Sequence, residues 1–151
     1  MRLRNPQAGF SMAEMLIVIA FIGIAVGIGI PLVNEQVRIA EVRSSADDLA
    51  LHLRAARMIA VAKHKTIVFT VSADPTNTFS YEGNDGKMKT ITMPNRVKIA
   101  AGSDNSISFL QNGAVDAVSA VILESQVSDK LERWTATVNT VGLTTLAHVR
   151  I

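Results

Sequence analysis

Apolar residues fill the first part of the chain and then give way to a helical pattern. Residues 10–33 hold one charged residue, Glu14, in a run longer than the roughly 20 residues that a membrane-spanning helix needs. Over 34–65 the apolar positions recur at spacings of three and four, which predicts one buried helix face. These positions are Val42, Ala46, Leu49, Leu53, Ala56 and Ala60. We therefore expect one helix over about 11–62, kinked at Pro31 because proline removes a backbone hydrogen bond.

From residue 66 onward the pattern changes to short β-branched and aromatic runs separated by turn residues such as Asp74-Pro75 and Asp85-Gly86. The expected strands are 67–71, 79–81, 87–93, 97–99, 106–109, 115–123, 134–138 and 143–151. Short strands with frequent turns indicate an antiparallel sheet. The sequence thus predicts an α+β fold, in which a long N-terminal helix, half transmembrane and half amphipathic, packs on a β-rich head of residues 66–151.

Charge before the apolar run predicts its orientation in a membrane. Arg2 and Arg4 precede the run, and there is no acidic residue between Met1 and Gly9. Basic residues keep their side of a membrane helix in the cytoplasm, so residues 34–151 are expected outside. A secretory signal peptide would have an apolar core of about 7–15 residues and a small-residue cleavage site. This run is longer, and no such site follows it.

The residues that open the run resemble a known processing signal. The stretch G-F-S-M-A-E, from Gly9 to Glu14, leads into an apolar helix with Pro31 at its far end. It resembles the class III leader of type IV pilins and type II secretion pseudopilins. The resemblance implies that prepilin peptidase removes residues 1–9 by cutting between Gly9 and Phe10 and methylates the new Phe10 amine. It also places Glu14 at the fifth position of the mature chain, where this family has an acidic residue.

An ionised Glu14 inside a bilayer needs a counter-charge. Insertion of such an acid costs about 2.5–3.5 kcal/mol, so an acid retained there is a functional-site hypothesis. The cut after Gly9 would create an ammonium on Phe10 that can pair with the Glu14 of a neighbouring subunit. At a separation of about 4 Å this attraction is worth roughly 4 kcal/mol for an effective dielectric constant of about 20. The alternative is a plain single-pass anchor that carries a stray acid.

The head resembles the GspH/FimT-type subgroup of minor pseudopilins and minor pilins. The resemblance rests on residues 44–63 followed at once by a strand, on I-S-F-L-Q-N-G at 107–113, and on a strand pair around Val141-Gly142. Some members bind DNA through G-R-x-R, but the matching place here reads G-L-T-T, from Gly142 to Thr145. The leader holds two of the 15 Lys and Arg, so the mature chain balances 13 bases against 13 acids. We do not expect direct nucleic-acid binding.

The sequence contains no residue pattern typical of a catalytic, cofactor or metal site. There is no cysteine, which excludes thiol catalysis, cysteine metal sites and disulfides. The three histidines lack ligand spacing, with His52 expected on the exposed side of the helix and His64 in the loop after it. Residues 83–87 lack the spacing of a phosphate-binding loop and are interpreted as a tight turn. Trp134 is expected in the core of a strand. We therefore predict no enzyme activity, no cofactor and no metal.

Two functions remain open. The first is a minor pilin or pseudopilin, which is a structural subunit of a type IV pilus or of a type II secretion pseudopilus. Its expected partners are other pilin subunits and an inner-membrane assembly platform, and its expected role is in pilus biogenesis or protein secretion. The second is a membrane-tethered binding module whose head recognises a secreted substrate or DNA. Gly9 and Glu14 favour the first, because a tether needs neither. The expected location is the inner membrane, single-pass, with a cytoplasmic N-terminus and a periplasmic or extracellular head, followed by the filament.

Overall fold

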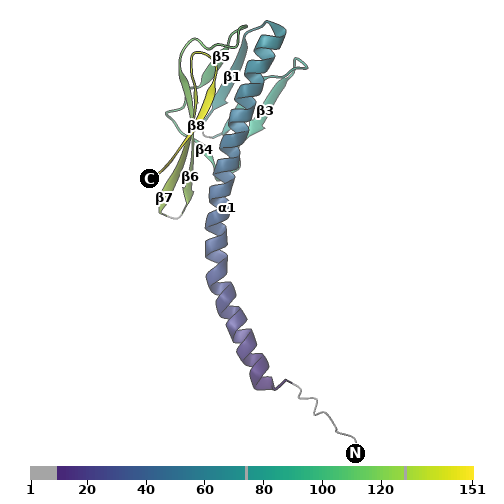
Figure 1. The fold of residues 1–151 in the computed structure, drawn as a ribbon, viewed down its shortest axis with the longest axis vertical. Coiled ribbons are helices and arrows are strands. Elements are labelled where there is room, and N and C mark those ends of the chain that lie inside the picture. The colour runs from purple at the N-terminus through teal and green to yellow at the C-terminus, as the bar shows by residue number, and fades with distance from the viewer. Residues whose placement is uncertain (1–9, 74, 128) are drawn as a thin grey trace, which may run out of the picture. The chain divides into compact units, whose positions relative to one another are not determined.

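The structure is a computed structural model that describes residues 10–73, 75–127 and 129–151, without the side chains of residues 28–32. It contains one long helix, α1 (Met12–Lys63), which confirms the helix expected over about 11–62 (Figure 1). The kink expected at Pro31 lies outside the described side chains and stays a prediction. The chain divides into two units, residues 1–36 and 37–151, which are described separately below.

In the first unit α1 carries apolar side chains on all of its sides. Phe10 is 77% exposed just before the helix, and within the helix the large apolar residues from Met12 to Val26 are exposed as well. Exposed apolar residues of this density are unusual for a surface that faces water. No helix among the described residues combines the length and the apolar character that crossing a membrane requires.

In the second unit α1 buries the predicted apolar face. All six positions of the stripe, from Val42 to Ala60, are at most 1% exposed, as their three- and four-residue spacing predicted. The helix ends in a Schellman motif, in which Lys65 N–H donates to the Ala60 carbonyl and His64 N–H to the Val61 carbonyl. His64 adopts a φ of 50° there. This turn directs the chain from the helix into the first strand.

The strands form two four-stranded antiparallel sheets, where the sequence pattern had predicted one sheet. The first sheet has the order β3-β2-β1-β5, and the second has the order β4-β6-β7-β8. The bounds of the first four strands are β1 (Ile67–Ser72), β2 (Thr78–Glu82), β3 (Met88–Thr92) and β4 (Lys98–Ile99). The others are β5 (Ser106–Phe109), β6 (Ser119–Val127), β7 (Lys130–Val138) and β8 (Thr144–Arg150). Periodicity locates strands but does not specify their partners, so it could not divide them between two sheets.

One predicted strand is displaced along the chain. The expected strand 115–123 is β6 at 119–127, and Val115 makes only an isolated bridge to Phe109. The long hairpin of β6 and β7 accounts for this displacement, because its register pairs Ser119 with Val138 and Val127 with Lys130. Pairing with β7 therefore decides where β6 begins and ends.

A single hydrophobic core joins the helix stripe to both sheets. The first sheet contributes Phe69, Phe79 and Phe109, and the second contributes Val121 and Leu123, all at most 1% exposed. The rings of Phe69 and Phe79 stack with centroids 5.3 Å apart. Full burial of such a side chain contributes about 1.5–3 kcal/mol. The head is thus held by packing on α1, and the chain has no disulfide because it has no cysteine.

Candidate functional site

Two of the predicted processing and assembly residues, Phe10 and Glu14, lie at the start of α1. Gly9 lies outside the described residues, and so does the side chain of Pro31. Phe10 lies two residues before the first residue of the helix and is exposed, and Glu14 lies exposed in the first turn. The Glu14 carboxylate has no ion-pair partner among the described residues. The structure thus places Phe10 and Glu14 at the start of α1, both of them exposed.

The helix start contains a cap that the sequence analysis did not identify. Ser11 Oγ accepts a hydrogen bond from the Glu14 N–H at 3.2 Å, and the Ser11 carbonyl accepts one from Met15 N–H. The residues S-x-x-E from Ser11 to Glu14 match the sequence signature of a capping box, which was the signal that could have revealed it. An acid in the first turn also interacts favourably with the helix dipole, by about 0.3–1 kcal/mol. Glu14 therefore has a local structural role beside any role in assembly.

His52 joins α1 to the first sheet, which corrects its predicted exposure. Its Nδ1 lies 2.8 Å from the Tyr81 hydroxyl, and its ring centroid lies 5.4 Å from that of Phe79. Burial lowers the pKa of His52, and Lys89 lowers it further, while Asp48 acts in the opposite sense. Burial also raises the pKa of Tyr81. The neutral imidazole therefore suits this contact as acceptor of the Tyr81 O–H.

Arg57 holds two loops of the head against α1. Its Nε donates to the Gly113 carbonyl at 3.0 Å. Gly113 and Gly142 adopt φ angles of 78° and 80°, which favour glycine. A Cβ on Gly142 would lie 1.9 Å from the Gly113 oxygen. The position that matches the start of the G-R-x-R stretch is thus occupied by a glycine that close packing requires.

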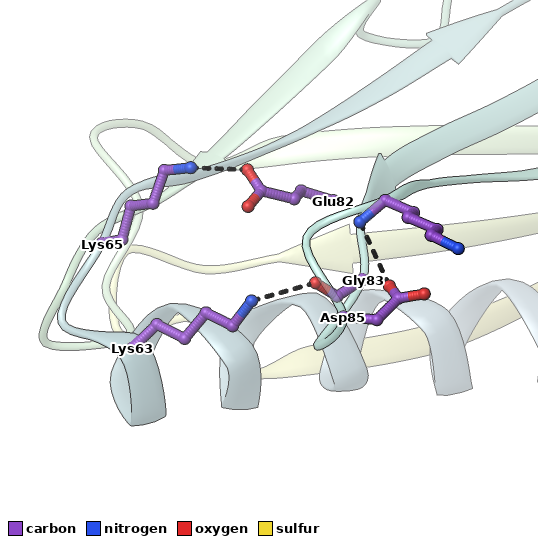
Figure 2. Close-up of polar contacts among 6 residues, drawn as sticks. Lys63, Lys65, Glu82, Gly83 and Asp85 are labelled. Carbon is purple, nitrogen blue, oxygen red and sulfur yellow. Dashed lines mark hydrogen bonds and ion pairs between the residues drawn. The ribbon is translucent and has the colours of Figure 1, made fainter.

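The end of α1 contacts the hairpin that joins β2 and β3 (Figure 2). Lys63 Nζ donates to the Gly83 carbonyl at 3.2 Å, and Lys65 Nζ lies 2.6 Å from Glu82 Oε2. That ion pair holds the pKa of Glu82 below its usual range. Asp85 Oδ1 accepts the Lys87 N–H at 3.1 Å within the turn.

The segment that joins β2 and β3 is a tight turn closed by its own backbone. Gly83 N–H donates to the Lys87 carbonyl at 2.8 Å, and Gly86 adopts a φ of 78°, which confirms the predicted tight turn. A shallow cavity of about 630 Å³ lies between this turn and Ile59 and Tyr81 of the head. In the part of the chain that the structure describes, no three His, Cys, Asp or Glu side chains lie close enough together to hold a metal ion.

A buried acid links the last two strands. Glu132 of β7 is 1% exposed, and its two oxygens contact His148 Nε2 at 2.6 Å and Arg150 Nε at 2.8 Å. The His148 ring stacks on Trp134 with centroids 4.6 Å apart. Trp134 is partly buried against the core, in a strand as predicted, and its Nε1 has no hydrogen-bond partner among the described residues. The cluster ties the edge strand β8 to its neighbour.

Two solved structures, of a minor pilin and of a minor pseudopilin, share this architecture. The type IV minor pilin FimU of Pseudomonas aeruginosa matches with a TM-score of 0.56 and 15% identity, over 72% of this chain and 89% of FimU. The minor pseudopilin EpsH from the type 2 secretion system of Vibrio cholerae matches with a TM-score of 0.53 and 15% identity, over 72% of this chain and 96% of EpsH. No family model and no curated protein sequence matches the chain. The chain therefore has the fold of a type IV minor pilin and of a type II secretion minor pseudopilin.

Proposed function

We propose that this protein is a minor pilin or pseudopilin, a structural subunit of a filament that supports pilus biogenesis or protein secretion. Prepilin peptidase cuts it between Gly9 and Phe10 and methylates the Phe10 amine. Other pilin subunits and an inner-membrane platform then assemble it through Glu14. The observation that carries this proposal is the exposed pair of Phe10 and Glu14 at the start of an apolar helix, in a chain whose head has the fold of FimU and EpsH.

The helix geometry supports the role of Glu14. Its carboxylate has no ion-pair partner among the described residues, while its backbone N–H is satisfied by Ser11. A cation from a second chain would offset the cost of the charge in a bilayer, which is about 2.5–3.5 kcal/mol. The α-amine of a cleaved Phe10 is a cation of this kind. Its pairing with the Glu14 of a neighbour would set the axial position of one subunit against the next.

The proposed location before assembly is the inner membrane, with a cytoplasmic N-terminus and an external head. Support comes from the sequence of residues 10–33, in which Glu14 is the single charged residue. The sequence stays apolar over residues 28–32, whose side chains the structure does not describe. It also comes from the exposure of the large apolar residues between Met12 and Val26. In lipid this exposure carries no penalty, whereas in water it would.

The experiment has two arms, processing and assembly. Mass spectrometry of the chain from cells that express a prepilin peptidase should find a methylated N-terminal Phe10. In a filament co-assembly assay Glu14→Ala should insert into membranes as the wild type does but fail to enter the filament. Asp47→Ala is the matched control, because it removes an exposed acid from the head half of the same helix.

The outcomes separate the two candidate functions. A mature terminus other than Phe10, or normal co-assembly of Glu14→Ala, would overturn the filament role. A membrane-tethered binding module would then remain, and its head would have to bind a secreted substrate or DNA without assembly. No contact within the described head favours that alternative over the filament subunit.

A further inference from the structure

A polar cavity of about 440 Å³ lies in the second unit where α1 meets the second sheet. Arg38 lines it from α1, Lys98 from β4, and Arg96 from the segment just before β4. Ser125 and Gln126 of β6 form another part of the wall. The cavity is separate from the helix start and from the hairpin in Figure 2, and the proposed function makes no use of it.

The shortness of β4 leaves this cavity open. This strand has two residues, and it pairs with β6 only through Lys98 with Glu124 and Ile99 with Leu123. Because β6 continues to Val127, its outer edge beyond Glu124 has no partner strand among the described residues. An unpaired strand edge presents backbone N–H groups, which are donors for an anion or for water. Gln126 directs its backbone N–H to that open edge, because Leu131 opposite it exchanges its backbone hydrogen bonds with Ile151.

The cations that line the cavity are poorly neutralised. Arg38 and Lys98 form no ion pair within the described part of the chain. Arg96 Nη1 lies 3.7 Å from Glu41 Oε2, which is too long for a hydrogen bond.

The acid in the wall is already engaged elsewhere. Glu124 Oε1 accepts a hydrogen bond from Arg133 Nε at 2.7 Å, and Arg133 Nη2 lies 2.6 Å from the same oxygen. Of the three cations that line the cavity, Arg96 has a long ion pair with Glu41, and Arg38 and Lys98 have none among the described residues. This arrangement favours an external anion with several acceptor oxygens.

We propose that this cavity binds a phosphate group, held by Arg38, Arg96 and Lys98 and by the open edge of β6. Guanidinium and ammonium groups together with backbone N–H donors are the partners that a phosphate oxyanion takes in proteins. The chain offers them from two elements, α1 and the β4–β6 edge, which meet only in the folded head.

The chain spacing points to a phospholipid headgroup as the source of this phosphate, an argument that rests on the proposed membrane anchor. Arg38 lies five positions after Val33, which in a helix corresponds to a rise of about 7.5 Å. The headgroup layer is about 5–7 Å thick on each side of the hydrocarbon. Arg38 would then lie at the outer boundary of the headgroup layer, from which a long arginine side chain can reach a lipid phosphate.

The test uses the full-length chain in zwitterionic detergent micelles with amide NMR as the readout. One arm adds inorganic phosphate, a second adds micelles doped with phosphatidylglycerol, and a third adds phosphatidylcholine as the neutral lipid. The amide signals of Arg38, Lys98 and Gln126 should shift together with phosphatidylglycerol. Arg38→Gln and Lys98→Gln should each weaken this binding by about fivefold, since a basic residue near an anionic lipid contributes about 1 kcal/mol.

Arg43→Gln is the matched control, because Arg43 is an exposed arginine of the same helix that does not line the cavity. It should bind as the wild type does. Unchanged amide spectra elsewhere in the head show that each variant is folded. Joint shifts with inorganic phosphate but not with phosphatidylglycerol would establish the phosphate site and exclude the lipid as its source. The absence of joint shifts in both arms, or equal loss in Arg43→Gln, would overturn the proposal.

A failure of the phosphate site can be told apart from a failure of the proposed filament role. A chain that is processed and assembles normally but binds neither probe would overturn the phosphate site alone. A chain that binds phosphate through Arg38 and Lys98 but is neither cut nor assembled would overturn the filament role alone.

Discussion

A Cβ atom on Gly142 would lie 1.9 Å from the carbonyl oxygen of Gly113, the same oxygen that accepts a hydrogen bond from Arg57 of α1. The two glycine turns and the arginine thus form one contact that holds the loops after β5 and β7 against the helix. Because both glycines have positive φ angles, this contact depends on backbone conformation as well as on space.

Gly142→Ala should destabilise the head by at least about 2 kcal/mol. The substitution adds an overlap with backbone, which typically costs about 1–3 kcal/mol, to the cost of the positive φ, which is about 1–2 kcal/mol for a non-glycine residue. Urea unfolding of the full chain in micelles, followed by Trp134 fluorescence, measures the change. Gly86→Ala is the control, because Gly86 has a φ of 78° with open space around its Cβ position. Equal losses in the two variants would show that the close approach does not matter.

Acidification should weaken the contact between His52 and Tyr81. Because the pKa of His52 is lowered in the folded head, the unfolded chain binds more protons below pH 6.5. The stability contribution of His52 is therefore complete above pH 6.5 and is lost as the pH falls through the folded pKa. Urea midpoints between pH 7.5 and 5 should fall more steeply for the wild type than for His52→Gln.

Between pH 7.5 and 5 the titration of Glu82 does not interfere with that of His52. The pKa of Glu82 is lowered from 4.5 by Lys65, so the contribution of Glu82 is lost only at more acidic pH. Parallel slopes for the wild type and His52→Gln above pH 5 would contradict the assignment to His52.

Glu132→Gln should loosen the attachment of β8 to β7. The substitution removes a buried charge that contacts both His148 and Arg150, and hydrogen bonds to charged groups contribute about 1.5–3 kcal/mol. Hydrogen exchange of the β8 amides should accelerate, and the urea midpoint should fall. Glu124→Gln is the comparison, because Glu124 pairs with a partly exposed Arg133, and its loss should cost less than about 1 kcal/mol. A larger loss of stability in Glu124→Gln than in Glu132→Gln would contradict this prediction.

Ser11→Ala separates the capping role of the helix start from its role in assembly. Loss of an N-cap serine costs about 1 kcal/mol and should fray the first turn. If Glu14 acts mainly through its charge, Ser11→Ala should still enter the filament, whereas Glu14→Gln should not. Mass spectrometry must show that both variants are cut after Gly9. Identical assembly defects in the two variants would assign the effect to the cap.

Local pattern predicted the kind and order of the elements, but not every strand boundary and not the contacts between elements. The stripe from Val42 to Ala60 could be predicted because a helix repeats every 3.6 residues, and every member of it is buried. His52 was placed on the wrong face because its neighbours on α1 gave no sign of Tyr81, which lies 29 residues further along the chain. The strand at 119–127 was misplaced because its pairing with β7 decided its bounds.

The sequence by itself determined the long helix, its apolar first half, the buried stripe, the β-rich head and the candidate pair of Phe10 and Glu14. These features depend on residues close together in the chain, so period and spacing reveal them. Tertiary structure alone decided the two-sheet division, the close approach of Gly142 to Gly113, the burial of Glu132 and the cavity around Arg38. Each of these joins residues far apart in the sequence, and only the pairing of strands and their packing on α1 brings such residues together.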